Sequence, residues 1–179
     1  MARSVGISVD RPVLVLDFGS QYVQLIARRV RERHAFATVV RHDITLERVK
    51  ELNPLAIILS GGPMSAYDAN APKCDPRLFD LGVPVLAICY GMQLVCEALG
   101  GEVLPAKDRE FGRAECRVIA AEEPLFHDVP ESITVWMSHG DHVTKVPEGF
   151  NTTATTGEMI TAIENIEKNL FAVQFHPEV

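Results

Sequence analysis

Apolar residues in the first half of the chain fall into short runs separated by segments with helical spacing. The runs 13–17, 36–40 and 56–59 are typical of buried strands, and the segments 21–33 and 46–52 have the length and spacing of helices. Alternation of this kind predicts parallel βαβ units. We therefore expect an α/β fold with an open, mostly parallel sheet and flanking helices.

The second half of the chain is richer in strands, several of them expected to be antiparallel. Strand patterns cover residues 113–119, 133–137, 159–164 and 171–175, and loops are expected at 122–130 and 145–156. Between the halves, helices are expected at Arg77–Leu81 and Leu94–Leu99, and the glycine pair 100–101 ends the second of them.

An apolar run from Val83 to Ile88 ends at Cys89, which a glycine and a helix-like segment follow. This pattern predicts a strand-to-helix elbow with a strained backbone at the cysteine and small residues around the turn. Gly91 meets that requirement and Ala87 nearly does. Because the N-terminal end of a helix favours negative charge, the elbow promotes thiolate over thiol. Taken alone, the run also fits a buried core cysteine.

The end of the chain is a β-rich run that carries a histidine and a glutamate two positions apart. On an extended chain, His176 and Glu178 point the same way. The glutamate can then fix the imidazole tautomer and stabilise its cation, while the other ring nitrogen faces a nucleophile, for which Cys89 is the candidate. A His-Pro-Glu tripeptide alone is more often a solvated strand end. Together with the elbow, it predicts a Cys-His-Glu triad.

Two further strand-like runs end in residues that suit a ligand site. The run 55–59 stops before a glycine pair, and the N–H groups of Gly62 and Tyr90 are candidates to stabilise the negative oxygen of a tetrahedral intermediate. A simple βα turn is the alternative. The run 133–137 leads into a polar loop at 138–141. Because ligands bind beyond the carboxyl ends of strands in open α/β sheets, we expect these segments to converge with the elbow and the terminal histidine.

Five motifs, in order from about Val13 to the last residue, are together similar to the class I glutamine amidotransferase domain of GMP synthetases. They are Asp17–Tyr22, Ser60–Pro63, Cys89–Gln93, Trp136–Asp141 and Gln174–Val179. The second, third and fifth are shared across class I amidotransferases, whereas the first and fourth resemble GMP synthetases in particular. The resemblance implies a flavodoxin-like sheet.

The resemblance also implies a role for each residue of the site. Cys89 would attack the side-chain amide of L-glutamine, His176 would carry the proton and Glu178 would orient it. A γ-glutamyl thioester would remain until water, activated by the histidine, releases glutamate. The oxyanion would be framed by the backbone of Gly61, Gly62 and Tyr90. The amino-acid end of the substrate would be held by Gln93, Ser138, His139, Gly140 and Asp141.

In this family the ammonia passes to an ATP-pyrophosphatase domain, fused or separate, that aminates XMP to GMP in purine biosynthesis. ATP and magnesium are expected only in that synthetase domain, and neither a cofactor nor a metal is expected in the residues of this chain. We expect residues 1–11 to form an N-terminal tail and residues 12–179 the amidotransferase domain. One departure from the family is Ala87, commonly a glycine, whose extra methyl group is expected to be tolerated.

The chain stops directly after the His-Pro-Glu motif and contains no Ser-Gly-Gly-Val-Asp-Ser pyrophosphatase loop. We therefore expect a truncated domain that cannot make GMP by itself. Enzymes of this kind resemble gated systems in which a partner completes the site. The isolated chain is accordingly expected to hydrolyse glutamine slowly or not at all.

Composition narrows the function classes. A chain of 179 residues with 47% apolar and 23% charged residues is ordinary for one soluble domain. The net charge of −7 argues against a nucleic-acid partner, and the basic cluster 28–33 is interpreted as a solvated helix face. No uncharged run approaches the roughly 18 residues that span a membrane, and residues 1–11 have no signal-peptide core. A cytoplasmic protein without a membrane partner is expected, and an oligomer is compatible with the sequence.

The remaining cysteines and histidines carry no motif. The cysteines lack a paired C-x-x-C spacing, so neither a zinc site nor a disulfide framework is indicated. Those expected to be structural are Cys74, Cys96 and Cys116. The histidines expected on the surface or in loops are His34, His42, His127 and His142.

Three alternatives stay open. The first is a different class I amidotransferase, such as those that supply anthranilate or carbamoyl phosphate synthesis, and the Trp136–Asp141 segment weighs against it. The second is a stand-alone thiol hydrolase acting on γ-glutamyl compounds. The third is a non-catalytic binding or regulatory module of the same fold, and the presence of all three triad residues weighs against it.

Overall fold

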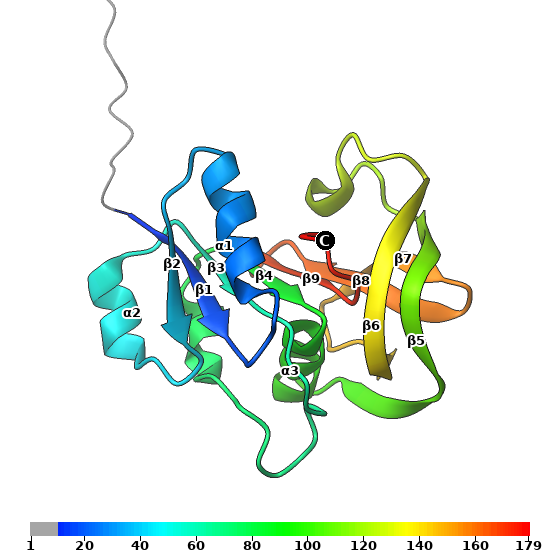
Figure 1. Ribbon diagram of the computed structural model, residues 1–179, viewed down its shortest axis with the longest axis horizontal. Helices are drawn as coiled ribbons and strands as arrows, with labels where there is room; N and C mark the ends of the chain where they lie inside the picture. Colours follow the sequence, from blue (N-terminus) through cyan, green and yellow to red (C-terminus); the bar gives the residue numbers. More distant parts are fainter. Residues whose placement is uncertain (1–10) are drawn as a thin grey trace, which may run out of the picture.

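The computed structural model describes residues 11–179, apart from the side chains of residues 107–110. It contains one nine-stranded mixed sheet with the strand order β2-β1-β3-β4-β9-β8-β7-β5-β6 (Figure 1). The expected α/β fold is confirmed. Of the tail expected at residues 1–11, all but Arg11 lies outside the described residues, and Arg11 donates hydrogen bonds to the carbonyls of Asn53 and Pro54.

Five neighbouring strands form the parallel part of the sheet. They are β2 (Ala37–Arg41), β1 (Val13–Asp17), β3 (Ala56–Leu59), β4 (Val85–Ile88) and β9 (Leu170–Val173). Their sequences are almost wholly apolar because both faces of the sheet are covered. Successive side chains of β1 show this, since Val13 and Val15 belong to one hydrophobic cluster and Leu14 and Leu16 to the other.

Helices cover the two faces of the parallel part. Helix α1 (Val23–Glu32) buries Val23 and Ile26 in the same cluster as Val15. Helices α2 (Leu46–Leu52) and α3 (Tyr90–Ala98) pack in the opposite cluster with Leu16. The parallel part is therefore a three-layer α/β/α arrangement, which positions the carboxyl ends of its strands along one edge.

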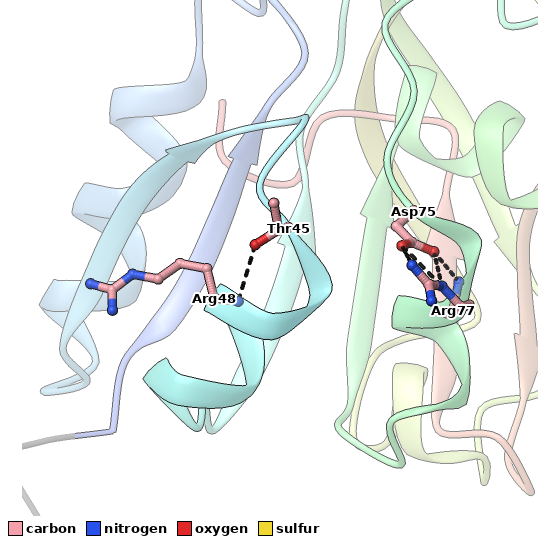
Figure 2. A network of polar contacts seen from close by, with 4 residues as sticks. All are labelled: Thr45, Arg48, Asp75 and Arg77. Atoms are coloured by element: carbon pink, nitrogen blue, oxygen red, sulfur yellow. Dashed lines mark hydrogen bonds and ion pairs between the residues drawn. The ribbon is translucent and has the colours of Figure 1, made fainter.

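Local capping sets the bounds of the short helices, as Figure 2 shows. The Thr45 side chain accepts a hydrogen bond of 3.2 Å from the Arg48 N–H at the start of α2, and Asn53, with φ of +44°, ends the helix. Asp75 accepts in the same way from the Arg77 N–H, at 3.0 Å, at the start of the 3₁₀ helix η1 (Pro76–Asp80). Caps of this kind contribute about 1 kcal/mol each.

The remaining strands are antiparallel and lie beyond β9. They are β8 (Met159–Asn165), β7 (Asn151–Thr156), β5 (Glu102–Val118) and β6 (Ser132–Lys145). The two long strands β5 and β6 stand at the far end of the sheet from α2 (Figure 1). A short 3₁₀ helix, η2 (Pro124–Phe126), lies in the connection between them.

Two predicted loops in this part were wrong. Residues 145–156 contain the strand β7, which sits inside the sheet between β8 and β5. Its threonines made the segment look polar, yet β-branched residues suit a strand, and Thr153 and Ala154 are fully buried. Residues 138–141 lie within β6 because their backbone pairs with β5. His142, expected on the surface or in a loop, is accordingly half-buried in the same strand.

Other predicted elements differ mainly in their bounds. Helix α3 begins at Tyr90, four residues earlier than expected, and β5 begins at Glu102 rather than at Arg113. The helix expected at Arg77–Leu81 is the 3₁₀ helix η1. Strand β9 ends at Val173, because the chain then turns away from the sheet toward β6.

Candidate active site

The thiol of Cys89 is displayed at the turn between β4 and α3. The backbone of Cys89 has φ of +52° and ψ of −106°, a region that residues with a side chain rarely adopt, so the predicted strain is confirmed. Its N–H donates to the Val173 carbonyl at 2.8 Å. A Cβ atom added at Gly91 would lie 2.8 Å from the Leu59 carbonyl oxygen, so only glycine lets the turn approach β3 this closely.

His176 and Glu178 form a buried pair next to this elbow. Their side chains are 5% and 2% exposed, and the Glu178 Oε1 lies 2.8 Å from the His176 Nδ1. The predicted contact is confirmed, but the extended geometry behind it was wrong, since Val179 N–H donates back to the His176 carbonyl in a turn. The backbone N–H of His176 donates to the Trp136 carbonyl at 2.9 Å, which anchors the turn on β6.

The environment of His176 favours its cationic form. Burial lowers the pKa of His176, but hydrogen bonds with Cys89 and with Glu178 outweigh burial and raise it to about 9. Burial also lowers the pKa of the neighbouring His139, and here the hydrogen bond with the Asp141 backbone does not compensate. The two histidines of the site are therefore held in opposite protonation states near neutral pH.

The glycine pair after β3 lies against the elbow and the histidine. A Cβ atom added at Gly61 would lie 3.0 Å from His176 Cε1, and one added at Gly62 would lie 2.8 Å from the Phe18 carbonyl oxygen and 3.2 Å from Tyr90 Cγ. A side chain at Gly62 would clash with the backbone, and one at Gly61 would require the His176 ring to shift by a few tenths of an ångström. The Tyr90 N–H is the first of α3 and has no partner within the helix. The arrangement can thus present backbone donors beside the thiol.

A pocket of about 670 Å³ opens above these residues. The structure brings most of the predicted site residues to its wall. Gly61 and Glu178 do not line the pocket, but both lie against His176, which does. The predicted residues that line it are Gly62, Cys89, Tyr90, Gln93, Ser138, His139, Gly140, Asp141 and His176.

Strand β6 forms the wall opposite α3. The Ser138 carbonyl lies 3.6 Å from the Cys89 sulfur and accepts its weak hydrogen bond. The Gln93 amide nitrogen donates to the Asp141 carbonyl at 3.2 Å, and His139 Nδ1 lies 2.8 Å from the same oxygen. The backbone of this strand therefore ties the nucleophile's helix to the far side of the pocket.

Several residues at the site carried no sequence prediction. The Asp141 carboxylate accepts hydrogen bonds from Ser65 and Tyr67, at 2.5 Å and 3.0 Å, which join the segment after the glycine pair to β6. Tyr22 packs against His176, and Arg29, interpreted as part of a solvated face, donates to the Glu178 carbonyl. Tyr22 and Arg29 are seven positions apart, a spacing that places them on one helix face but does not show what that face contacts.

The other cysteines are poor nucleophiles. All four cysteines are free, and burial raises the pKa of Cys74 and of Cys96 to about 12, and also raises that of Cys116. Among the described residues, no group of three or more His, Cys, Asp or Glu side chains is placed to hold a metal ion. No helix in the described part of the chain is long and apolar enough to cross a membrane.

Comparison with known proteins places this geometry in a family. The family model for glutamine amidotransferase class-I matches residues 14–179. The chain belongs to the class I glutamine amidotransferase family. Its relatives include the GMP synthases [glutamine-hydrolyzing] of Mycobacterium marinum, 52% identical over 172 residues, and of Oceanobacillus iheyensis, 55% identical over 168 residues.

These matches cover 96% and 93% of the amidotransferase chain, but only 32% and 33% of the two relatives. The chain thus spans about a third of the length of the curated relatives that it matches. Among solved structures, a Thermoplasma acidophilum protein provisionally assigned to GMP synthase has a TM-score of 0.82 at 27% identity, over 94% of this chain and 85% of that one. A glutamine amidotransferase from Thermotoga maritima, at 23% identity, shares the fold with a TM-score of 0.78, over 95% and 77%.

Proposed function

We propose that the chain is the glutaminase part of a GMP synthase, and that it hydrolyses L-glutamine to glutamate and ammonia through Cys89, His176 and Glu178. The observation that carries this proposal is a buried imidazole beside a strained elbow that opens into a pocket. Its Nδ1 lies 2.8 Å from the Glu178 carboxylate, and a Cβ atom added at Gly61 would lie 3.0 Å from His176 Cε1 and 3.6 Å from Cys89 Cβ, so the ring and the thiol-bearing side chain are neighbours. That is the arrangement that covalent acyl transfer by a thiol requires.

The reaction proceeds through an acyl-enzyme. The thiolate of Cys89 attacks the side-chain amide carbon of glutamine, and the negative oxygen that forms is stabilised by the N–H groups of the Gly61-Gly62 loop and of Tyr90. The imidazolium of His176 gives its proton to the departing nitrogen, which leaves as ammonia and creates a γ-glutamyl thioester.

The same imidazole, now neutral, removes a proton from the incoming water. The resulting hydroxide adds to the thioester carbonyl, glutamate leaves, and the thiolate and imidazolium are restored. Glu178 holds the orientation of the imidazole and favours the cationic histidine before each turnover. Gln93 and the β6 wall at 138–141 hold the amino-acid end of glutamine, a role that their position on the pocket wall supports.

The domain that receives the ammonia is inferred from the GMP synthases that this chain resembles. Because GMP synthases match at 52–55% identity, the partner would be an ATP-pyrophosphatase domain that uses ATP and magnesium to aminate XMP. The test is glutamate release from glutamine, measured for the chain alone and with that synthetase, ATP and XMP. Stimulation by the complete mixture is expected. Hydrolysis without stimulation would indicate a stand-alone γ-glutamyl hydrolase or another amidotransferase, and no hydrolysis under either condition would indicate a non-catalytic module.

A further inference from the structure

Helix α1 contacts the His176–Glu178 turn at two points, through two residues that are not members of the proposed triad. The first is made by Tyr22 at the start of the helix and the second by Arg29 in its last turn. The C-terminus lies beside this helix in the middle of the molecule (Figure 1). The turn is therefore held between α1 on one side and the Trp136 carbonyl of β6 on the other.

The Tyr22 ring packs edge-to-face against the imidazole. The two ring centroids lie 5.4 Å apart with an angle of 67° between the rings. Tyr22 is itself held in place, because its N–H donates to the Ser20 hydroxyl at 3.0 Å and its carbonyl accepts from the Ile26 N–H at 3.0 Å. An aromatic ring at this distance limits the space in which the imidazole can move, and the quadrupole of an aromatic ring attracts a cation that lies over its face within about 6 Å of the centroid.

The Arg29 side chain acts on the other member of the pair. Its Nε donates to the backbone carbonyl of Glu178 at 3.0 Å, and its Nη1 lies 3.2 Å from a carboxylate oxygen of Glu32. The ion pair holds the guanidinium, and the guanidinium holds the peptide that carries the glutamate. Arg28 also bonds Glu32, at 3.0 Å, but its side chain is more exposed than that of Arg29, 73% against 53%.

We propose that Tyr22 and Arg29 are positioning residues of the glutaminase site, through which helix α1 sets the orientation of the His176–Glu178 pair. The two residues are seven positions apart, which is about two helical turns, so they act from one face. Ile26 lies between them on that face and is buried, which fixes the helix against the sheet. This inference rests on the proposed function.

The consequence concerns the proton on His176. The titratable groups that face its ring are Cys89 from the elbow, Glu178 from its own turn, Tyr22 from α1 and His139 from β6. Removing the ring of Tyr22 leaves the cation less stabilised, so the imidazolium loses its proton at a lower pH. The basic limb of the kcat profile should then move toward neutral pH.

The first test compares Tyr22→Leu with Tyr22→Phe in the chain assayed with the synthetase, ATP and XMP. Tyr22→Leu is expected to move the basic limb down by about half a pH unit and to lower kcat, whereas Tyr22→Phe, which keeps the ring, should leave the limb in place. An unmoved limb in Tyr22→Leu, with the folded circular dichroism spectrum retained, would overturn the role of Tyr22.

The second test uses the adjacent arginine as its matched control. Arg29→Ala is expected to lower kcat about tenfold at nearly constant KM, and Arg29→Lys, which can still donate to the carbonyl, should recover most of the loss. Arg28→Ala, which removes the neighbouring contact with Glu32, should behave as wild type. Equal effects of Arg28→Ala and Arg29→Ala would overturn the role of Arg29. A wild-type chain without glutaminase activity would instead reject the proposed function, so the two failures are distinct.

Discussion

The parallel and antiparallel parts of the sheet contribute to the site in different ways. The parallel strands β3 and β4 are buried on both faces, and β3 leads into the glycine pair while β4 leads into the elbow at Cys89. The antiparallel strand β6 lies at the edge of the sheet and contributes backbone carbonyls, from Trp136, Ser138 and Asp141. The parallel part supplies the thiol that we propose as the nucleophile. The antiparallel part supplies the backbone carbonyls that contact Cys89, Gln93 and His176.

The junction between the two parts is strand β9, which is parallel to β4 and antiparallel to β8. Its Val173 carbonyl accepts from the Cys89 N–H, and three residues later the His176 N–H donates to β6. The His176–Glu178 pair therefore lies at the boundary between the two parts of the sheet. A site built this way depends on both parts of the sheet. Variants in the parallel part and at the junction should lower kcat, whereas variants in the antiparallel part should mainly raise KM.

The largest effect is expected at the nucleophile in the parallel part. Cys89→Ala removes the atom that forms the thioester, so glutamate release should fall about 10⁴-fold or more while the circular dichroism spectrum is retained. The matched control is Cys96→Ala, a buried cysteine of the same helix region that should keep hydrolysis. Normal turnover by Cys89→Ala would show that the thiol is not the nucleophile.

A smaller loss is expected at the junction. Glu178→Gln keeps the shape of the side chain but removes the charge that favours the imidazolium, so kcat should fall about 10²-fold and its basic limb should move to lower pH. Steady-state glutaminase kinetics between about pH 6 and about pH 10, which bracket the expected limb, measure both. Glu148→Gln, at an exposed glutamate, is the control. A normal profile in Glu178→Gln would mean that the carboxylate is only structural.

The positive charge on His176 should also make the free energy of unfolding depend on pH. The pKa of His176 is raised in the folded chain to about 9, from an ordinary value near about 6.5. Its contribution to stability is therefore fully present below about pH 6.5 and is lost as the pH rises through about 9, a change on the order of 3 kcal/mol. Urea unfolding across this pH range should show a fall in the free energy of unfolding for the wild type and for the control His127→Gln, at an exposed site. His176→Gln should show no such fall. Parallel curves for all three would contradict the raised pKa.

The smallest effect is expected in the antiparallel part. Asp141→Ala removes the acceptor for Ser65 and Tyr67, so the segment after the glycine pair loses its attachment to β6. We expect KM for glutamine to rise about tenfold with a smaller change in kcat. Asp68→Ala, at an exposed aspartate of the same segment, should leave KM unchanged. If kcat fell and KM did not move, the wall would have to take part in the chemistry.

The parallel part was predictable because its signals are local. Helix α2 was predicted at its observed bounds, since Thr45 and Asn53 form its caps from within the segment. The elbow at Cys89 was predicted because a buried strand, a cysteine and a nearby glycine are consecutive in the chain. Both predictions needed only a few neighbouring residues.

The antiparallel part was less predictable because its structure depends on distant partners. Threonine-rich β7 becomes a strand only between β8 and β5, and 138–141 stays extended only because β5 pairs with it. The contacts of Asp141 with Ser65 and Tyr67 and of Arg29 with Glu178 join residues far apart in sequence. No local pattern encodes such contacts.

The central claim is that the thiol at the elbow forms a covalent bond with the γ-carbonyl of glutamine. The most direct measurement is peptide mass spectrometry of the wild-type chain after treatment with a chloroketone analogue of glutamine, with and without excess glutamine. The account predicts a label on Cys89 alone, prevented by glutamine and strongly slowed in His176→Ala. A label on Cys74, Cys96 or Cys116, or glutamine hydrolysis that continues in a chain fully labelled at Cys89, would contradict it.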